Sequence, residues 1–179
     1  MIDERTACVA FTGHRRYRGE ADDALAQTVE ELCRAGFRTF LSGMALGFDL
    51  AAAETVLVLR RRFPGIRLVA AIPCPGQAER YPAAERERYG RLLAQADERI
   101  TVSDVCDRGC YRRRNDYLVD CASVVVAWYD GSPSGTGYTV GRARRCGCRI
   151  IDLWRDPQPV LFADPVSYTH LTLPTILRV

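Results

Sequence analysis

The apolar residues of the chain follow two patterns that alternate with each other. Short apolar runs predict six strands, over residues 7–13, 37–43, 66–73, 99–103, 123–130 and 148–154. Longer segments with apolar positions three and four residues apart predict five helices, over residues 20–36, 48–63, 82–96, 111–121 and 136–145. This alternation predicts an α/β fold of the Rossmann-like, doubly wound kind, with a mainly parallel sheet of about six strands and helices on both faces.

The composition predicts a single domain. A chain of 179 residues can bury one substantial core. Residues 164–179 lack the arginine and alanine bias of the rest, so we expect a domain over residues 1–163 and a non-native or disordered tail beyond it. No run of 18 apolar residues predicts a membrane span, and the first residues do not resemble a signal peptide, so we expect a cytoplasmic protein.

Charge and cysteine content narrow the possible partners. All 25 basic residues are arginine, and acidic residues are interspersed among them, which argues against a nucleic-acid partner. The eight cysteines are expected to be thiols in a reducing compartment. Neither Cys106 and Cys110 nor Cys146 and Cys148 have the two-residue spacing usual in zinc sites, so we expect no metal and no cofactor.

Glycines occur in the loops that follow the first, second, third and fifth predicted strands, and they suggest a phosphate site. The carboxyl ends of parallel strands lie at one edge of a sheet, and glycines there let backbone amides approach an anion. A Walker P-loop is excluded because the chain has no lysine, and the G-x-G-x-x-G fingerprint is absent from the first loop. The candidate ligand-binding residues are Thr12, Gly13, His14, Arg15, Ser42, Gly43, Met44, Gly47, Asp49, Arg114, Asn115, Asp130, Gly135, Thr136 and Gly137.

Each of these candidates also has a simpler structural explanation. Gly13 and Gly43 would equally well close turns, and Asp49 would suit the start of a helix. His14 and the neighbouring arginines would suit a solvated loop. In the ligand-binding interpretation, residues 135–137 and Arg114 hold a phosphate, and Asp49 or Asp130 faces a ribose hydroxyl.

Four motifs resemble a known family. They are FTGHR, LSGMALGFDLAAAE, CYRRRNDYLVD and VVVAWYDGSPSGTGYTVGRA, and together they cover nearly all of residues 7–154. Their order and spacing resemble the YpsA-like branch of the SLOG superfamily, which includes the Smf/DprA and LOG proteins. The resemblance implies a Rossmann-like domain that binds a nucleotide or a nucleotide-derived small molecule, with a possible role in signalling or stress response and with homodimer formation as a further possibility.

The same resemblance leaves an enzymatic alternative open. LOG-type enzymes are phosphoribohydrolases that cleave an N-glycosidic bond in a nucleoside monophosphate, and they carry a G-T-x-x-E motif. The matching stretch here begins at Gly135, but Thr139 occupies the acidic position. A threonine cannot supply the negative charge that would stabilise the developing cation on the ribose. We therefore favour a binding protein, with Asp49, Glu54 and Asp130 as the carboxylates that a hydrolase would have to use instead.

Overall fold

A computed structural model of the chain describes residues 7–158. The predicted tail over residues 164–179 lies outside the described residues, as does the end of the predicted domain. Within residues 7–158, no helix is both long and apolar enough to cross a membrane.

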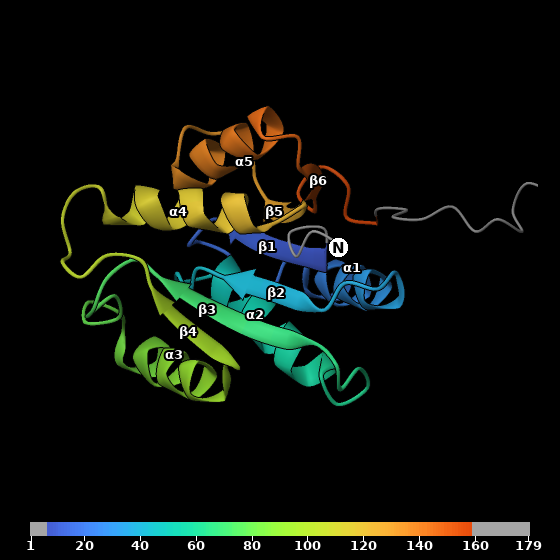
Figure 1. The fold of residues 1–179 in the computed structure, drawn as a ribbon, viewed down its shortest axis with the longest axis horizontal. Helices are drawn as coiled ribbons and strands as arrows, with labels where there is room; N and C mark the ends of the chain where they lie inside the picture. The colour runs from blue at the N-terminus through green and yellow to red at the C-terminus, as the bar shows by residue number, and fades with distance from the viewer. Residues whose placement is uncertain (1–6, 159–179) are drawn as a thin grey trace, which may run out of the picture.

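All eleven predicted elements form (Figure 1). The strands are β1 (Cys8–Gly13), β2 (Thr39–Ser42), β3 (Arg67–Ile72), β4 (Glu98–Thr101), β5 (Val124–Trp128) and β6 (Arg149–Asp152). The helices are α1 (Asp22–Arg34), α2 (Phe48–Leu59), α3 (Ala83–Gln95), α4 (Cys110–Cys121) and α5 (Gly135–Arg145). The strands are shorter than the apolar runs that predicted them, because the ends of those runs belong to the connecting loops.

The sheet is entirely parallel and has the strand order β4-β3-β2-β1-β5-β6. The chain builds outward from β1 to β4, then crosses back to add β5 and β6 on the other side of β1. The order therefore reverses between β1 and β5. In open parallel sheets, ligands bind beyond the carboxyl ends of the strands at this reversal.

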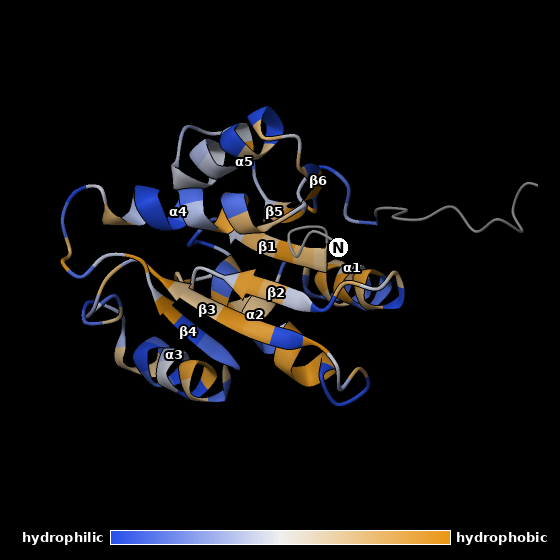
Figure 2. Cartoon of the chain, viewed as in Figure 1, coloured by the Kyte–Doolittle hydropathy of each residue, from blue (hydrophilic) through white to orange (hydrophobic). Residues whose placement is uncertain are grey.

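Helices cover both faces of the sheet, as predicted. Residues of α1, α2 and α3 pack in one buried cluster with the sheet, and residues of α4 and α5 pack in a second cluster on the opposite face (Figure 1). Strands β1, β2 and β3 are mainly hydrophobic, whereas the edge strand β4 is largely hydrophilic (Figure 2). This difference follows from position, because the inner strands of a parallel sheet are buried on both faces and an edge strand is not.

The expectation that every cysteine is a thiol is wrong for two of them. Cys74, in the loop after β3, forms a disulfide with Cys106, in the loop after β4. The two strands are neighbours in the sheet, so their following loops lie side by side and bring the two Cα atoms to 5.2 Å. Among the described residues, no group of histidine, cysteine or acidic side chains is arranged to hold a metal ion.

Candidate ligand-binding site

The carboxyl ends of β1, β2 and β5 bring the predicted loops to one edge of the sheet. β1 lies between β2 and β5, and Gly13 at the end of β1 is paired with Trp128 at the end of β5. The loop after β1 therefore has the loop of residues 129–134 on one side and the loop of residues 43–47 on the other. This is the neighbourhood that the sequence predicted for residues 42–47 and 131–137.

The loop after β2 is held by hydrogen bonds from its own sequence. The Ser42 hydroxyl donates to the Asp49 backbone carbonyl at 2.9 Å and accepts from the Met44 amide at 3.1 Å. Met44 has a φ of 58°, the only positive φ of a non-glycine among the described residues. Ser42 and Met44 are both fully buried. Their contribution is therefore to the shape of the loop and not to its solvent-exposed surface.

Gly47 allows two loops to meet. Its φ is 81°, and a Cβ there would lie 2.6 Å from the backbone carbonyl oxygen of Arg15 and 2.7 Å from that of His14. Only glycine fits this contact at this φ. Gly13 has a similar role at the end of β1, because a Cβ there would clash with the Phe48 side chain. Both glycines are explained by close packing between the first two loops.

Two buried ionisable side chains, Arg114 and Asp49, hold the backbone of residues 43–47. Arg114 and Asp49 are each only 4% exposed. Arg114 donates to the Gly43 carbonyl, which also accepts from the Gln77 amide at 2.9 Å. The Asp49 carboxylate accepts from the Ala45 amide at 3.3 Å. A Cβ on Gly43 would clash with the Arg114 guanidinium and lie 2.8 Å from the Asp49 carboxylate, so both side chains occupy the space beside Gly43 that a larger residue would need.

Burial dominates the electrostatics of this pair. Removal from water raises the pKa of Asp49 to about 6, although the positive charge of Arg114 acts in the opposite direction. Burial likewise lowers the pKa of Arg114, with Asp49 opposing that shift. The sequence predicted that Arg114 contacts a phosphate and that Asp49 or Asp130 faces a ribose hydroxyl. The structure places both beneath the loop, where they hold Gly43 and Ala45.

An ion pair between Asp130 and Arg16 connects the loop after β5 to the loop after β1. The Asp130 carboxylate lies 2.7 Å from the Arg16 guanidinium and 2.9 Å from His14 Nε2. His14 Nε2 accepts a hydrogen bond from the Asp130 amide at 3.1 Å, so it does not also donate to the carboxylate, and Arg16 is the cation that pairs with Asp130. The Ser132 amide donates to the Asp130 carboxylate at 2.8 Å. Hydrogen bonds from Ser132, with Arg16 beside them, hold the pKa of Asp130 far below its usual range. Asp130 is thus an ionised, paired carboxylate.

The start of α5 is more open than the loop after β2. The Ser134 hydroxyl caps the helix by accepting from the Gly137 amide at 3.0 Å. Gly135 is exposed, and Thr136 is 7% exposed. The first turn contains no acidic residue, so the positive end of the helix dipole has no charge to neutralise it there. Gly137 is required by packing, because a Cβ there would lie 2.9 Å from the Tyr129 hydroxyl.

Side chains of α4 connect the two loops. The Arg114 guanidinium donates to the side-chain oxygen Oδ1 of Asn115 at 2.8 Å. The side-chain nitrogen Nδ2 of Asn115 lies 3.8 Å from the position that a Cβ on Gly135 would occupy. The guanidinium carbon of Arg114 lies 5.7 Å from the centre of the Tyr111 ring, and that of Arg15 lies 5.6 Å from the same ring. A series of contacts therefore runs from Arg15 through Tyr111 and Arg114 to Asn115, whose side chain faces Gly135 at the start of α5.

Arg15 differs from Arg16 and Arg114 in its surroundings. It is exposed, and it forms no ion pair with any carboxylate of the described residues. Arg16, in contrast, is paired with Asp130, and Arg114 is buried. Of these three arginines, Arg15 is thus the one whose charge faces solvent without a carboxylate partner.

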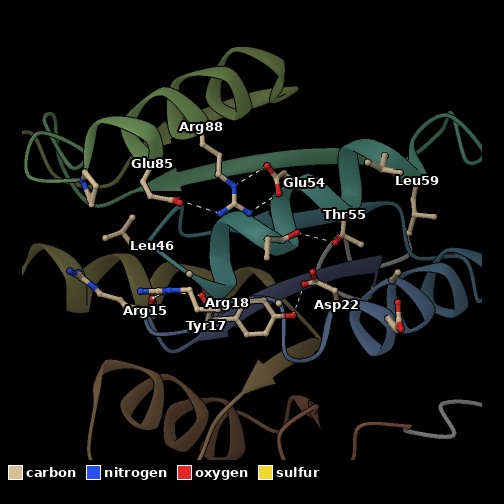
Figure 3. A pocket seen from close by; sticks show the side chains of 17 residues that line it. Arg15, Tyr17, Arg18, Asp22, Leu46, Glu54, Thr55, Leu59, Glu85 and Arg88 are labelled. Carbon is tan, nitrogen blue, oxygen red and sulfur yellow. Dashed lines mark hydrogen bonds and ion pairs between the residues drawn. The ribbon is translucent and has the colours of Figure 1, made fainter.

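A hollow of about 710 Å³ lies beside this edge, on the face of the sheet that carries α1, α2 and α3 (Figure 3). Arg15, Leu46 and Gly47 line it from the candidate site, but no residue of 131–137 does. Its other walls include an ion pair between Arg88 and Glu54, at 2.6 Å. Residues 42–47 and residues 131–137 thus lie at the same edge of the sheet, but the hollow is lined only by the first of these two segments.

Three side chains near the site were missed by the sequence reasoning. Gln77 and Tyr81 come from the loop after β3, and the Tyr81 hydroxyl donates to the Met44 carbonyl at 3.1 Å. Tyr111, in the first turn of α4, lies between the two arginines. The loop after β3 was recognised as part of the edge, but nothing in its residue types pointed toward the loop of residues 43–47.

Comparison with known proteins establishes the family. A family model described as the YspA SLOG family, named YpsA, matches residues 11–145. The chain therefore belongs to this family, as its four motifs indicated. It is 32% identical to the SPbeta prophage-derived protein YoqJ of Bacillus subtilis over 136 residues, which cover 69% of this chain and 80% of YoqJ. It is also 32% identical to a UPF0398 protein of Halalkalibacterium halodurans over 62% of each chain.

Two solved structures share the fold. The DNA processing protein A of Helicobacter pylori, described for its single-stranded DNA binding mode, has a TM-score of 0.60 and 20% identity over 82% of this chain. The DNA processing protein A of Streptococcus pneumoniae has a TM-score of 0.61 and 18% identity over 87% of this chain. This chain spans 65% and 55% of those two proteins, which is less than two thirds of each.

These neighbours correct one expectation from the sequence. The interspersed acidic residues were taken as an argument against a nucleic-acid partner. That argument is wrong, because the same fold occurs in a protein described as binding single-stranded DNA. Net charge and its spacing along the chain do not report which charges gather at one edge of the folded sheet.

Proposed function

We propose that the carboxyl edge of the sheet binds the phosphate of a nucleotide or nucleotide-derived ligand, between Arg15 and the start of α5. The observation that carries this proposal is that an exposed guanidinium without an ion pair within residues 7–158, that of Arg15, and a helix N-terminus without acidic residues, at Gly135, lie at the same edge of the sheet. Contacts run from Arg15 through Tyr111 and Arg114 to Asn115, whose side chain faces Gly135. Both groups favour an anion, and the reversal of strand order at β1 and β5 is where such sheets bind their ligands.

In this proposal the two loops have different tasks. The loop of residues 43–47 is a packed support, fixed from below by Arg114 and Asp49. The start of α5 supplies the backbone of Gly135, which is exposed, whereas the Gly137 amide already donates to the Ser134 hydroxyl. The hollow beside Arg15 and Gly47 gives the rest of a nucleotide a place to extend, since Arg15 lines both regions.

The direct test is calorimetric titration of the protein with AMP and with ADP-ribose, in wild type and Arg15→Gln. We expect Arg15→Gln to weaken binding about tenfold or more, because a charge-assisted hydrogen bond is worth about 1.5–3 kcal/mol. Arg144→Gln is the matched control, since Arg144 is exposed in the last turn of α5, at the opposite end of that helix. Equal affinity in wild type and Arg15→Gln would remove Arg15 from the site.

Hydrolysis of an N-glycosidic bond has less support than binding. Thr139, at the acidic position of the LOG-type motif, is 1% exposed, and its hydroxyl donates to the Gly135 carbonyl at 2.9 Å. The alternative carboxylates are buried under a loop, in Asp49, or paired with arginine, in Glu54 and Asp130. We expect no free adenine when AMP is incubated with the protein, and turnover that is lost on Asp49→Asn would reverse this ranking.

Single-stranded DNA is a second candidate ligand, favoured by the fold shared with the Helicobacter pylori protein. Arg16 lies 5.0 Å from the ring centres of both Trp128 and Trp154, and Trp154 is 44% exposed. An exposed aromatic ring beside a cation can stack on a base near a phosphate. Fluorescence anisotropy of a labelled oligothymidylate tests this candidate. It predicts binding that weakens with salt and with Trp154→Ala, whereas binding of AMP alone would leave anisotropy unchanged.

A further inference from the structure

Three cysteines meet behind the candidate site. Cys74 and Cys106 form the disulfide that joins the loops after β3 and β4. Cys110, the first residue of α4, is not part of it, and its sulfur lies 3.8 Å from the Cys74 sulfur. Cys74 and Cys110 are each 1% exposed, whereas Cys106 is exposed. A buried thiol is therefore in contact with the buried sulfur of a disulfide whose other sulfur faces solvent.

This arrangement matches the requirements of thiol–disulfide exchange. Exchange begins with a thiolate that reaches one sulfur of a disulfide, and the other sulfur leaves as a thiolate. The contact defines which sulfur is attacked, because Cys110 touches Cys74. The leaving sulfur would be Cys106, which water can hydrate because that residue is exposed.

We propose that Cys74, Cys106 and Cys110 form a thiol–disulfide exchange site, in which Cys110 displaces Cys106 from Cys74. Cys110 gives up its proton, and its thiolate forms a new bond to the Cys74 sulfur. The bond between Cys74 and Cys106 breaks, and Cys106 leaves with the electron pair and takes up the proton that Cys110 lost. One disulfide and one thiol are present before and after, so no oxidant or reductant is consumed. The product carries a surface thiol at Cys106, open to modification by a low-molecular-weight disulfide.

The exchange changes which parts of the fold are linked. In the present state, Cys74 is bonded to the surface loop of residues 102–109, which is also held by Arg113 through Asp107 at 2.7 Å and Ser103 at 2.9 Å. After exchange, Cys74 would be bonded to α4 itself. The new link would move the cross-link from a surface loop to the first turn of a helix.

That helix and the Cys74 loop both hold one carbonyl of the candidate site. Arg114 lies four residues after Cys110, so both side chains are on the same face of α4. Gln77 lies three residues after Cys74, and both Gln77 and Arg114 donate to the Gly43 carbonyl. A bond between Cys74 and Cys110 would thus join the two supports of that carbonyl. The exchange itself needs no ligand, so its test is independent of the function proposed above.

The test is irreversible alkylation of the folded, non-reduced protein with iodoacetamide at pH 8, followed by mass spectrometry of its disulfides and labelled peptides. Alkylation traps each Cys106 thiol as it is released. We expect alkylated Cys106 to accumulate together with a disulfide between Cys74 and Cys110. Cys33 is the internal reporter of unfolding, because it is buried in α1, and burial raises the pKa of its thiol to about 11. Cys106 should be labelled at least ten times faster than Cys33.

Two variants separate exchange from general opening of the protein. Cys110→Ser keeps the size of the side chain but removes the nucleophile, so Cys106 labelling should fall at least tenfold. Cys146→Ser, which changes an exposed cysteine elsewhere, should leave the rate unchanged. The proposal is overturned if Cys106 is labelled only together with Cys33, if Cys110→Ser is labelled as fast as wild type, or if the three cysteines carry no disulfide in the purified protein.

Discussion

The loop after β2 and the loop that leads into α5 are both rich in glycine, but the first is buried and the second is exposed to solvent. Both follow a buried strand, both contain two or more glycines, and both lead into a helix. Residues 43–45 and 47 are buried, and the side chains of Arg114 and Asp49 pack against Gly43. Residues 131–135 are exposed, and a Cβ on Gly135 would meet only the Asn115 amide, at 3.8 Å. A glycine-rich stretch after a strand therefore indicates either close packing or an open anion site, and only the neighbouring elements decide which.

The largest effect that this comparison predicts is at Arg114. Replacement by methionine would leave the buried Asp49 carboxylate without the positive charge that favours its ionised form, and an uncompensated buried charge costs about 3–5 kcal/mol. We expect that loss in the free energy of unfolding by urea at pH 8. The loss should be smaller at pH 5, where Asp49 is protonated. Arg144→Met, at an exposed position, should change stability by less than about 0.5 kcal/mol. Equal effects of the two variants would contradict a supporting role for Arg114.

The two glycines should respond differently to alanine. Gly43→Ala forces the Arg114 guanidinium or the Asp49 carboxylate to move, and overpacking of this kind costs about 1–3 kcal/mol. There is room for a methyl group at Gly135, which lies at the start of a helix. The free energy of unfolding of Gly135→Ala should therefore stay within about 1 kcal/mol of the wild-type value. Thermal or urea unfolding compares the two directly. A larger loss at Gly135 would reverse the assignment of packed and open loops.

The pH dependence of stability should carry the signature of Asp49. Its pKa is about 6 in the folded protein and near the ordinary 3.8 when unfolded, so the folded state binds more protons between these values. Stability linked to this group therefore falls as the pH rises from about 4 to about 6, by roughly 2–3 kcal/mol. Asp49→Asn should remove that part of the slope, while the exposed Asp104→Asn should keep it. A slope unaffected by Asp49→Asn would contradict the burial of an ionisable carboxylate.

The smallest predicted effect concerns the exposed side of the site. Arg16 is one of the groups that lower the pKa of Asp130, after the hydrogen bonds from Ser132. Arg16→Gln should therefore move the pKa of Asp130 part of the way back toward its ordinary value, as measured by NMR titration of the carboxyl carbon. Global stability should hardly change, because exposed ion pairs contribute little. A pKa that stays where it is in wild type would show that Arg16 does not contact Asp130 in solution.

The sequence was sufficient for the fold because each element carries its own pattern. The apolar runs around β5 and the helical spacing in α1 are local signals, and the strand order follows from the connections that parallel sheets permit. The positions of the loops at one edge followed from the same reasoning. These features need no information about which side chains meet across the fold.

The roles of individual site residues could not be read in this way. Asp49 and Arg114 lie 65 positions apart in the sequence, and their burial under one loop depends on how α4 crosses back over the sheet. The disulfide between Cys74 and Cys106 likewise depends on the adjacency of β3 and β4. The hollow beside Arg15 arises from the packing of three helices. Such features require tertiary contacts that residue types alone do not specify.

The most direct test of the central claim is to place a negative charge at the start of α5. Gly135→Glu adds a carboxylate to an exposed position with space for it, where it would repel a bound phosphate. Gly90→Glu is the matched control, because Gly90 is exposed on α3 and also has open space. In calorimetric titrations with AMP and ADP-ribose, the phosphate site predicts at least tenfold weaker binding for Gly135→Glu and wild-type affinity for Gly90→Glu. Wild-type affinity in both variants would contradict a phosphate at this edge of the sheet.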